Sequence, residues 1–349
     1  TPPSFTEHRV LHFRFESALF SHTLAMNKKS LIQLTEEHTG KVSDKWSCYL
    51  STYDAALQNY RDKPIRILGI QNGGSLEIWS KFFPHAEKIV GCDIDSRCGD
   101  LQYSDPRISV VIGNANETET LKKINHISTE FDIIIDDGSH KSSDIIESFF
   151  LYFPKLKTGG IYIAEDLHCS YWTQFEGGLY YPYSALSFFK RLTDVINHEH
   201  WGTSKTKRQF LQGFLSRYNI EPDERALENI QSIGFSNSIC QIKKGSIGDL
   251  LLGKRVISGD EAIVNESILT KSRSSLTQYD QTQNPWSALE LPPEEAFIQL
   301  SRKHQDQSAI IKILQLELQH KSRNINHAIN QSADIAKKFA ATQQTLHEI

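Results

Sequence analysis

The sequence lacks any run of about 18 consecutive apolar residues, the length that a membrane-spanning helix needs. Its start also lacks the basic residues and the apolar core of a secretory signal. We therefore expect neither membrane insertion nor secretion. The formal net charge of −4 gives no general attraction to polyanions, so we also expect no nucleic-acid partner.

Cysteine is scarce, with five residues, an odd number, and no CxxC pair among them. These residues are Cys48, Cys92, Cys98, Cys169 and Cys240. This pattern favours reduced thiols in a cytoplasmic protein over a disulfide framework. The chain begins at Thr1 rather than methionine and stops inside a repeating pattern, so we expect a fragment of a longer protein.

β-type and helix-type stretches alternate between about residues 63 and 244, which predicts an α/β fold with a doubly wound, mostly parallel, Rossmann-like sheet. The expected parallel strands cover residues 65–70, 88–93, 108–113, 131–136 and 160–165. Between the last two we expect an amphipathic helix that is closed by Gly159 and Gly160. Helices near 184–198 and 205–217 then precede an antiparallel hairpin formed by IQSIGF and SICQIKK.

Composition divides the chain further. We expect a helical N-terminal cap over 1–60, the Rossmann-like domain over 61–258, a polar linker over 259–292 and a coiled coil over 293–349. Apolar residues recur every seven positions from Phe297 and from Leu300. A strict seven-residue period favours a coiled coil, and hence a homo-oligomer, over a single amphipathic helix that packs on its own domain.

Two pairs of acids follow expected strands. Asp136 and Asp137 end the fourth strand, and Glu165 and Asp166 end the fifth. Neighbouring strands lie about 5 Å apart, so both pairs emerge at the carboxyl edge of the sheet, where such folds bind ligands. Carboxylates this close repel one another unless a cation lies among them, and oxygen ligands favour Mg²⁺ over Zn²⁺.

The alternative for "DDGSH" is a turn in which an aspartate caps the next helix. A turn explains one or two of the acids but not the matching pair after the next strand. His140, three residues beyond Asp137, is placed to accept a proton from a metal-bound hydroxyl near neutral pH, although a histidine at a helix start is often only a capping residue. His168 is the reserve candidate, and Tyr171 and Trp172 are candidate walls for a sugar.

The first expected strand runs into GIQNGGSLEIW, residues 69–79, where glycines allow the backbone to turn and to approach a ligand. The pattern is not GxGxxG. Asp93 ends the second strand, where it is placed to bind the ribose hydroxyls of an adenosine-type cofactor. An NAD-dependent oxidoreductase would share these features, but it would leave the carboxylate cluster without a role.

Five stretches, in this order, resemble the metal-dependent sugar O-methyltransferases of macrolide antibiotic biosynthesis and the related cephalosporin-modifying family. The stretches are HTGKVSDKWSCYLSTYDAAL, GIQNGGSLEIW, GCDID, IIIDDGSH and GGIYIAEDLHCSYW. The resemblance covers about residues 35–250. It implies a class I fold that binds S-adenosylmethionine, with His140 as the general base. The implied Mg²⁺ ligands are Asp137, Glu165 and Asp166.

The resemblance also implies the cofactor-binding residues. Gly69, Gly73, Gly74 and Ser75 would line the methionine end of the cofactor and Asp93 would hold its ribose, with Lys45, Asn114 and Asp136 completing the set. Lys45 belongs to a segment that folds over the site in that family. Ile67 stands where the family carries an acid, and Asn114 replaces an aspartate associated with the adenine. These departures motivate a further alternative, a non-catalytic assembly module.

The expected reaction is methyl transfer to a sugar hydroxyl, with a carbohydrate acceptor as the partner. A methyltransferase joined to a long coiled coil resembles the enzymes that cap bacterial surface polysaccharides, so the terminal sugar of an O-antigen is the expected acceptor. A macrolide or other antibiotic sugar is the alternative.

Overall fold

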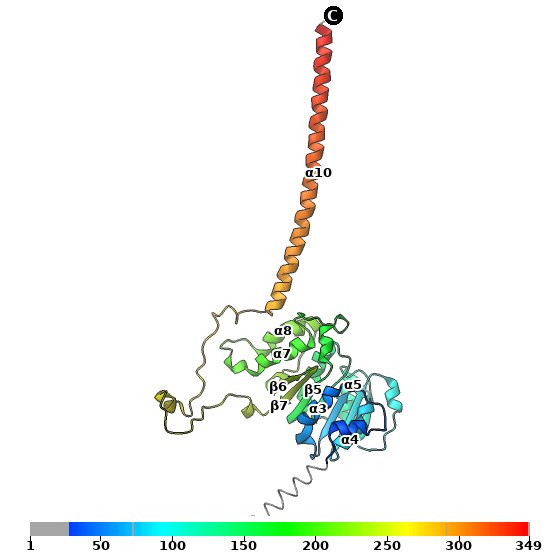
Figure 1. Cartoon of the computed structure of the whole chain (residues 1–349), viewed down its shortest axis with the longest axis vertical. Coiled ribbons are helices and arrows are strands. Elements are labelled where there is room, and N and C mark those ends of the chain that lie inside the picture. Colours follow the sequence, from blue (N-terminus) through cyan, green and yellow to red (C-terminus); the bar gives the residue numbers. More distant parts are fainter. Residues whose placement is uncertain (1–27, 72, 291, 348–349) are drawn as a thin grey trace, which may run out of the picture. The chain divides into compact units, whose positions relative to one another are not determined.

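The computed structural model describes residues 28–71, 73–290 and 292–347 (Figure 1). Part of the predicted N-terminal cap, residues 1–27, therefore lies outside the described residues. The chain divides into two compact units, the first ending at Glu290 and the second beginning at Leu291. The finer division into cap, catalytic domain and linker stays a prediction.

A single seven-stranded sheet forms the centre of the first unit, with the strand order β3-β2-β1-β4-β5-β7-β6. The strands are β1 (Arg66–Ile70), β2 (Lys88–Asp93), β3 (Ile108–Ile112), β4 (Phe131–Asp136), β5 (Leu156–Ala164), β6 (Ile230–Ser236) and β7 (Ile239–Lys244). Strands β1 to β5 are parallel, and β7 pairs antiparallel with both β5 and β6. The predicted parallel strands and the closing hairpin are confirmed.

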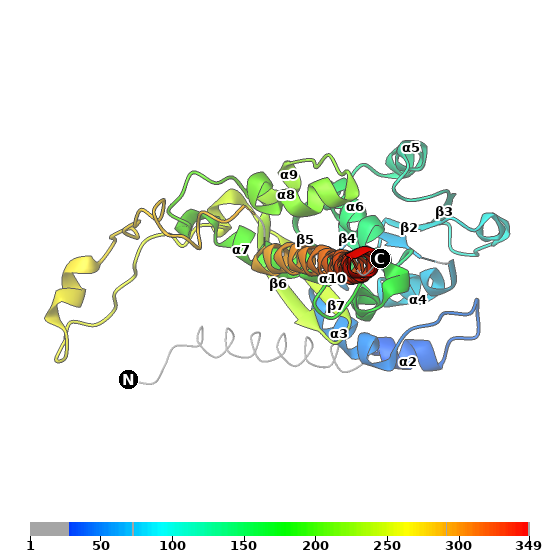
Figure 2. The same ribbon diagram turned by 90° about the horizontal axis from the view of Figure 1, so that it is seen from above.

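Helices cover both faces of the sheet (Figure 2). One face carries α2 (Leu31–Glu36), α3 (Ser47–Leu57) and α4 (Leu76–Phe82), and the other carries α5 (Thr118–Ile127), α6 (Ser142–Tyr152), α7 (Ala185–Ile196) and α8 (Lys207–Tyr218). A short helix, α9 (Arg225–Glu228), precedes β6. Strand side chains alternate between the faces, so Ile133 and Ile135 pack toward α3 and α4 while Ile134 packs toward α6. Burial on both faces explains why the central strands are continuous apolar runs.

The predicted end of the helix after β4 is wrong. Helix α6 ends at Tyr152, a 3₁₀ turn follows over Phe153–Lys155, and β5 already begins at Leu156. Pro154 lacks the amide hydrogen that a continuing helix would use. Gly159 and Gly160 therefore lie inside β5 rather than at the end of the helix, and Gly159 has a φ of +81°.

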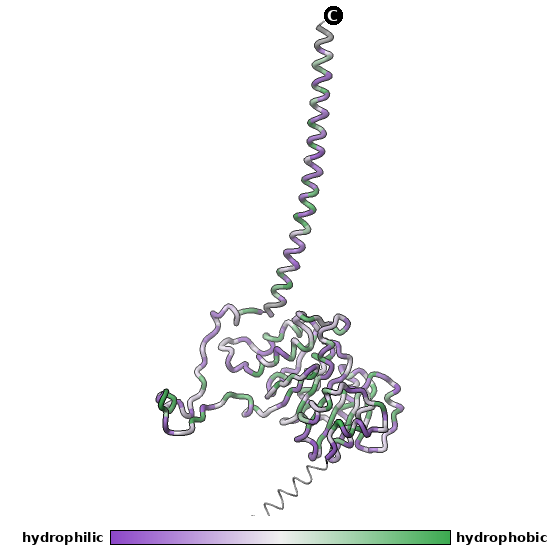
Figure 3. The backbone as a smooth tube through the Cα atoms, in the orientation of Figure 1, coloured by the Kyte–Doolittle hydropathy of each residue, from purple (hydrophilic) through white to green (hydrophobic). Residues whose placement is uncertain are grey.

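The second unit is a single helix of 55 residues, α10 (Pro293–His347). Its described side chains are mostly exposed in the single chain, and apolar residues recur along its length (Figure 3). Association through this helix stays a prediction. Among the described residues, no helix combines the length and the apolar character needed to span a bilayer.

Candidate active site

A cavity of about 510 Å³ lies along the carboxyl ends of the five parallel strands. In the order of the strands across the sheet, its polar lining includes Asn114, Asp93, Gln71, Asp136, Asp137, Glu165 and Asp166. Lys45 and His140 also line it. The structure thus brings together both predicted acid pairs, the predicted base and the predicted ribose acid.

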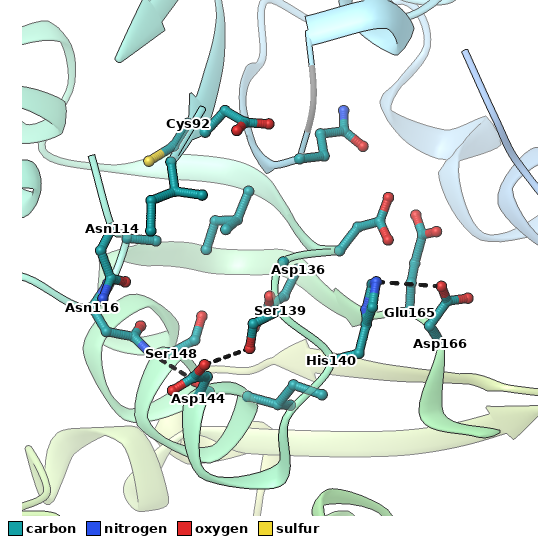
Figure 4. A pocket seen from close by; sticks show the side chains of 18 of the residues that line it. Cys92, Asn114, Asn116, Asp136, Ser139, His140, Asp144, Ser148, Glu165 and Asp166 are labelled. Carbon is teal, nitrogen blue, oxygen red and sulfur yellow. Dashed lines mark hydrogen bonds and ion pairs between the residues drawn. The ribbon is translucent and has the colours of Figure 1, made fainter. Parts of the chain in front are cut away.

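Asp136 points to the α6 side of the sheet (Figure 4). It has the same strand parity as Ile134, and it accepts a hydrogen bond of 2.7 Å from the hydroxyl of Tyr162. The residue is 4% exposed. Burial raises the pKa of Asp136 to about 6, although the Tyr162 hydrogen bond acts in the opposite direction.

Glu165 points to the opposite side of the sheet, toward α3. It is 1% exposed, it accepts a hydrogen bond from the hydroxyl of Tyr53, and its oxygens lie 2.8 and 2.9 Å from the Nζ of Lys45. The same ammonium donates to Asp137. A lysine from the N-terminal segment therefore bridges one carboxylate of each predicted pair.

Charge and burial act against each other at this bridge. Burial raises the pKa of Glu165 and of Asp137, and the charge of Lys45 opposes the rise. Burial lowers the pKa of Lys45, but the charges of Glu165 and Asp137 outweigh this effect, so the pKa of Lys45 lies above its ordinary value. We predicted that a metal ion balances the charge of these carboxylates. In the folded chain, the ammonium of Lys45 also balances part of it.

The side chains of His140 and Asp166 face each other in the cavity (Figure 4). Both residues also have an unusual backbone conformation. Their φ angles are 60° and 54°, a left-handed region that residues other than glycine rarely adopt and that often marks functional sites. The Nε2 of His140 lies 3.6 Å from Asp166. Asp166 also accepts hydrogen bonds from the hydroxyl of Tyr49 at 2.7 Å and from the Nε1 of Trp46 at 3.2 Å.

One cluster of side chains in this cavity has the composition of a metal site. Ligand atoms of Asp137, His140 and Asp166 lie within 4.8 Å of one another. The cluster contains two of the three predicted ligands. The third predicted ligand, Glu165, instead forms an ion pair with Lys45, which also pairs with Asp137. His140 also presents a buried Nδ1 that has no hydrogen-bond partner among the described residues.

The other end of the cavity carries polar groups suited to an adenosine (Figure 4). The carboxylate of Asp93 accepts a hydrogen bond of 2.7 Å from the backbone N of Asp95. The Nδ2 of Asn116 donates to the backbone oxygen of Asp144 at 3.0 Å, whereas its buried Oδ1 has no partner among the described residues. Asn114 accepts from the backbone N of Asn116 at 3.0 Å.

The cofactor-binding role of the glycine turn stays a prediction. Gly69, Gly73, Gly74 and Ser75 are buried, and none belongs to the described lining of the cavity. A Cβ on Gly74 would lie 1.6 Å from the backbone oxygen of Val42. The glycine turn therefore makes room for the N-terminal segment that carries Lys45.

The predicted acceptor residues lie beside the cavity, because the described lining does not include His168, Tyr171 or Trp172. The ring of His168 packs edge-on against Trp46, at 5.9 Å, and against Trp172, at 5.0 Å. Tyr171 and Trp172 are 45% and 49% exposed. Since Trp46 lines the cavity, these rings continue from it toward solvent.

Sequence reasoning missed Gln71 and three aromatic residues of the N-terminal segment, Trp46, Tyr49 and Tyr53. Tyr49 and Tyr53 are four residues apart, so they share one face of α3. That spacing was the available signal, because two tyrosines on an apolar helix face need polar partners when buried. No comparable signal marked Gln71.

Comparison with characterised proteins gives consistent relatives, although no family model matches the chain. It is 35% identical over 160 residues to the mycinamicin VI 2''-O-methyltransferase of Micromonospora griseorubida, covering 42% of this chain and 39% of that protein. It is 33% identical over 188 residues to the demethylmacrocin O-methyltransferase of Streptomyces fradiae, covering 49% and 46%. A third relative, 30% identical over 171 residues, is the 8-demethyl-8-alpha-L-rhamnosyl tetracenomycin-C 2'-O-methyltransferase of Streptomyces olivaceus, with coverage of 46% and 44%.

A solved structure is also similar. The MycE methyltransferase of the mycinamycin biosynthetic pathway, in complex with Mg, SAH and mycinamycin VI, aligns with a TM-score of 0.52 and 27% identity, over 63% of this chain and 54% of that one. The matches span less than half the length of the three curated relatives named above. The chain has the fold of the class I methyltransferases, and the three curated relatives are O-methyltransferases by name.

Proposed function

We propose that this protein is an S-adenosylmethionine- and Mg²⁺-dependent O-methyltransferase that acts on a sugar hydroxyl of a glycoside. One observation carries the proposal: a single cavity joins the adenosine-type acid Asp93 to the cluster of Asp137, His140 and Asp166. The relatives named above support the same reaction class.

The cavity fits the cofactor in size and in charge. Ligand pockets of this kind measure about 300–1,000 Å³, and the volume here is about 510 Å³. Carboxylates outnumber cationic groups in its lining. A positively charged sulfonium is favoured in such surroundings, whereas hydride transfer by a nicotinamide cofactor would leave the acids near His140 without a role.

The oxygen ligands fit a hard divalent cation. Asp137 and Asp166 would bind Mg²⁺. Glu165 would become a third ligand if its ion pair with Lys45 breaks. When bound, Mg²⁺ supplies Lewis-acid chemistry that lowers the pKa of a sugar hydroxyl.

Residues of the chain then position and deprotonate the acceptor. A ring nitrogen of His140 would take the hydroxyl proton. S-adenosylmethionine, when bound, would supply the methyl group to the acceptor oxygen, and its sulfur would keep the electron pair of the broken carbon–sulfur bond. Asp166, 3.6 Å from His140, stabilises the imidazolium that results. The rings of Trp46, His168 and Trp172 offer apolar surface to the sugar beside the cavity.

The choice of acceptor differs from our first expectation. The relatives named above act on mycinamicin and rhamnosyl-tetracenomycin compounds, which favours an antibiotic-type glycoside over the terminal sugar of a surface polysaccharide. The polysaccharide expectation rested on the long C-terminal helix alone.

Methyl transfer from labelled S-adenosylmethionine to a panel of rhamnosyl and related glycosides, with Mg²⁺ or with a chelator, tests the proposal. We expect transfer that needs Mg²⁺ and that falls at least a hundredfold in Asp137→Asn and in His140→Ala. Asp132→Asn is the matched control, since Asp132 pairs with Lys157 away from the cavity. Undiminished transfer in either variant would remove that residue from the mechanism.

The same preparation separates the competing functions. Binding of NAD without S-adenosylmethionine would indicate an oxidoreductase, and binding of neither would indicate a non-catalytic module. We also propose that α10 associates with a second copy, because apolar side chains at its seven-residue positions, among them Ile311, Leu314 and Leu318, are more than half exposed in the single chain.

A further inference from the structure

Gln71 is a buried polar residue in the middle of the cavity. It follows β1, the central strand of the five parallel ones, and is only 4% exposed although it lines the cavity. Neither its Nε2 nor its Oε1 has a hydrogen-bond partner among the described residues. Buried carboxamides are almost always paired, so this side chain requires a partner that the described residues do not supply.

The backbone at Gln71 and at Gly69 restricts where the carboxamide of Gln71 can lie. The N of Gln71 donates to the backbone oxygen of Cys92 at 3.0 Å, which fixes the main chain. A Cβ placed on Gly69 would lie 2.7 Å from the Nε2 of Gln71. The side chain thus lies over Gly69, and a Cβ at that position would force it to shift.

The order of the strands indicates which part of a ligand Gln71 meets. Asp93, on the neighbouring strand β2, is the ribose acid in the proposed complex, and Asp137, after β4 on the other side, belongs to the reacting centre. Each step across the sheet is about 4.8 Å. A group opposite Gln71 therefore lies between the ribose and the reacting centre, where the aminocarboxypropyl arm leaves the sulfonium.

We propose that the carboxamide of Gln71 binds the α-amino acid group of the cofactor. This inference rests on the proposed function. Its Oε1 accepts a hydrogen bond from the ammonium, and its Nε2 donates to the carboxylate. The carboxylate needs a neutral donor here because the charged groups around it are mostly acids, which repel it.

The test compares two ligands that differ in this group alone. S-adenosylhomocysteine carries the amino acid, whereas 5'-methylthioadenosine keeps the adenosine and the sulfur but lacks it. Calorimetric titration of the full chain with each ligand gives the preference for the amino acid. In Gln71→Leu, which keeps the size of the side chain, we expect S-adenosylhomocysteine to bind about ten to a hundred times more weakly and 5'-methylthioadenosine to bind unchanged.

Two controls keep the result interpretable. Gln58→Leu makes the same exchange at an exposed position outside the cavity, so both affinities should stay unchanged. Gln71→Glu places a charge beside the cofactor carboxylate and should weaken S-adenosylhomocysteine further. Thermal unfolding of ligand-free Gln71→Leu should occur at or above the wild-type temperature, because the exchange removes a buried amide without partners.

The outcomes separate this inference from the function on which it rests. If the wild-type chain binds neither ligand, the proposed function fails and the inference fails with it. If the wild-type chain prefers S-adenosylhomocysteine and Gln71→Leu keeps the full preference, the role of Gln71 alone is overturned. Equal weakening of both ligands in Gln71→Leu would also overturn it.

Discussion

Lys45 and a divalent cation should compete for the same carboxylates. The ammonium contacts both Asp137 and Glu165, and the side chains of Lys45 and Glu165 are only 9% and 1% exposed. Mg²⁺ can use both acids only if Lys45 gives up these charge-assisted hydrogen bonds. We therefore expect Lys45→Met, which keeps the length of the side chain and removes its charge, to bind Mg²⁺ more tightly.

The size of the effect follows from the bonds that the cation no longer has to displace. A hydrogen bond to a charged group is worth about 1.5–3 kcal/mol, which corresponds to a dissociation constant about 10 to 150 times lower. The metal-free variant should in turn be less stable by about 3–5 kcal/mol, the usual cost of removing one partner of a buried pair. Proton uptake by Glu165, whose pKa burial already raises, reduces that cost.

Calorimetric titration with Mg²⁺ and urea unfolding with and without the metal measure both quantities. Lys41→Met is the matched control, because Lys41 belongs to the same N-terminal segment but pairs with Glu77 at 2.8 Å, outside the cavity. An unchanged or weaker affinity for Mg²⁺ in Lys45→Met would refute the competition. Equal changes in both variants would assign the effect to the segment as a whole rather than to the bridge.

Three further predictions concern stability and association. Folding raises the pKa of Asp136 from 3.8 to about 6, so ionisation of this residue destabilises the fold as the pH rises through this range. In urea unfolding, Asp136→Asn should therefore raise the free energy of unfolding by about 3 kcal/mol at pH 7.5 and by almost nothing near pH 4. An equal gain at both pH values would contradict this reasoning. Tyr53→Phe removes the hydroxyl that donates to buried Glu165, so its free energy of unfolding should fall by about 1–3 kcal/mol, and an unchanged urea midpoint would argue against that bond. By light scattering, the wild-type protein should have a mass that is a multiple of the mass of one chain. Leu314→Asp should reduce this mass, whereas Gln315→Asp should leave it unchanged. A monomeric wild type would contradict the proposed association.

The sheet and its acidic edge could be predicted from the sequence because both depend on local patterns. Continuous apolar runs such as FDIIID identify buried parallel strands, and the position after a strand fixes the edge at which an acid emerges. Alternation along a strand also explains why Asp136 and Glu165 point to opposite faces. The ends of helices were harder to predict than the strands. The helix α6 ends before Pro154, several residues earlier than Gly159 and Gly160, where we predicted its end.

The contacts of the site could not be predicted because they join distant parts of the chain. Nothing local to Lys45 indicates that its ammonium reaches acids that follow β4 and β5. Local rules also place left-handed conformations at glycines, so the sequence DDGSH favours Gly138, whereas His140 adopts this conformation. The amide of Gln71 has no partner among the described residues, and this depends on how segments far apart in the sequence pack around it.

The long separations of these contacts affect how the site assembles. The bonds from Lys45 and Tyr53 to Glu165 close chain segments of 120 and 112 residues. Contacts of such high sequence separation form slowly because the entropy of closing the loop is lost before they contribute. A refolding chain would therefore recover its β-sheet signal before it regains affinity for its ligands.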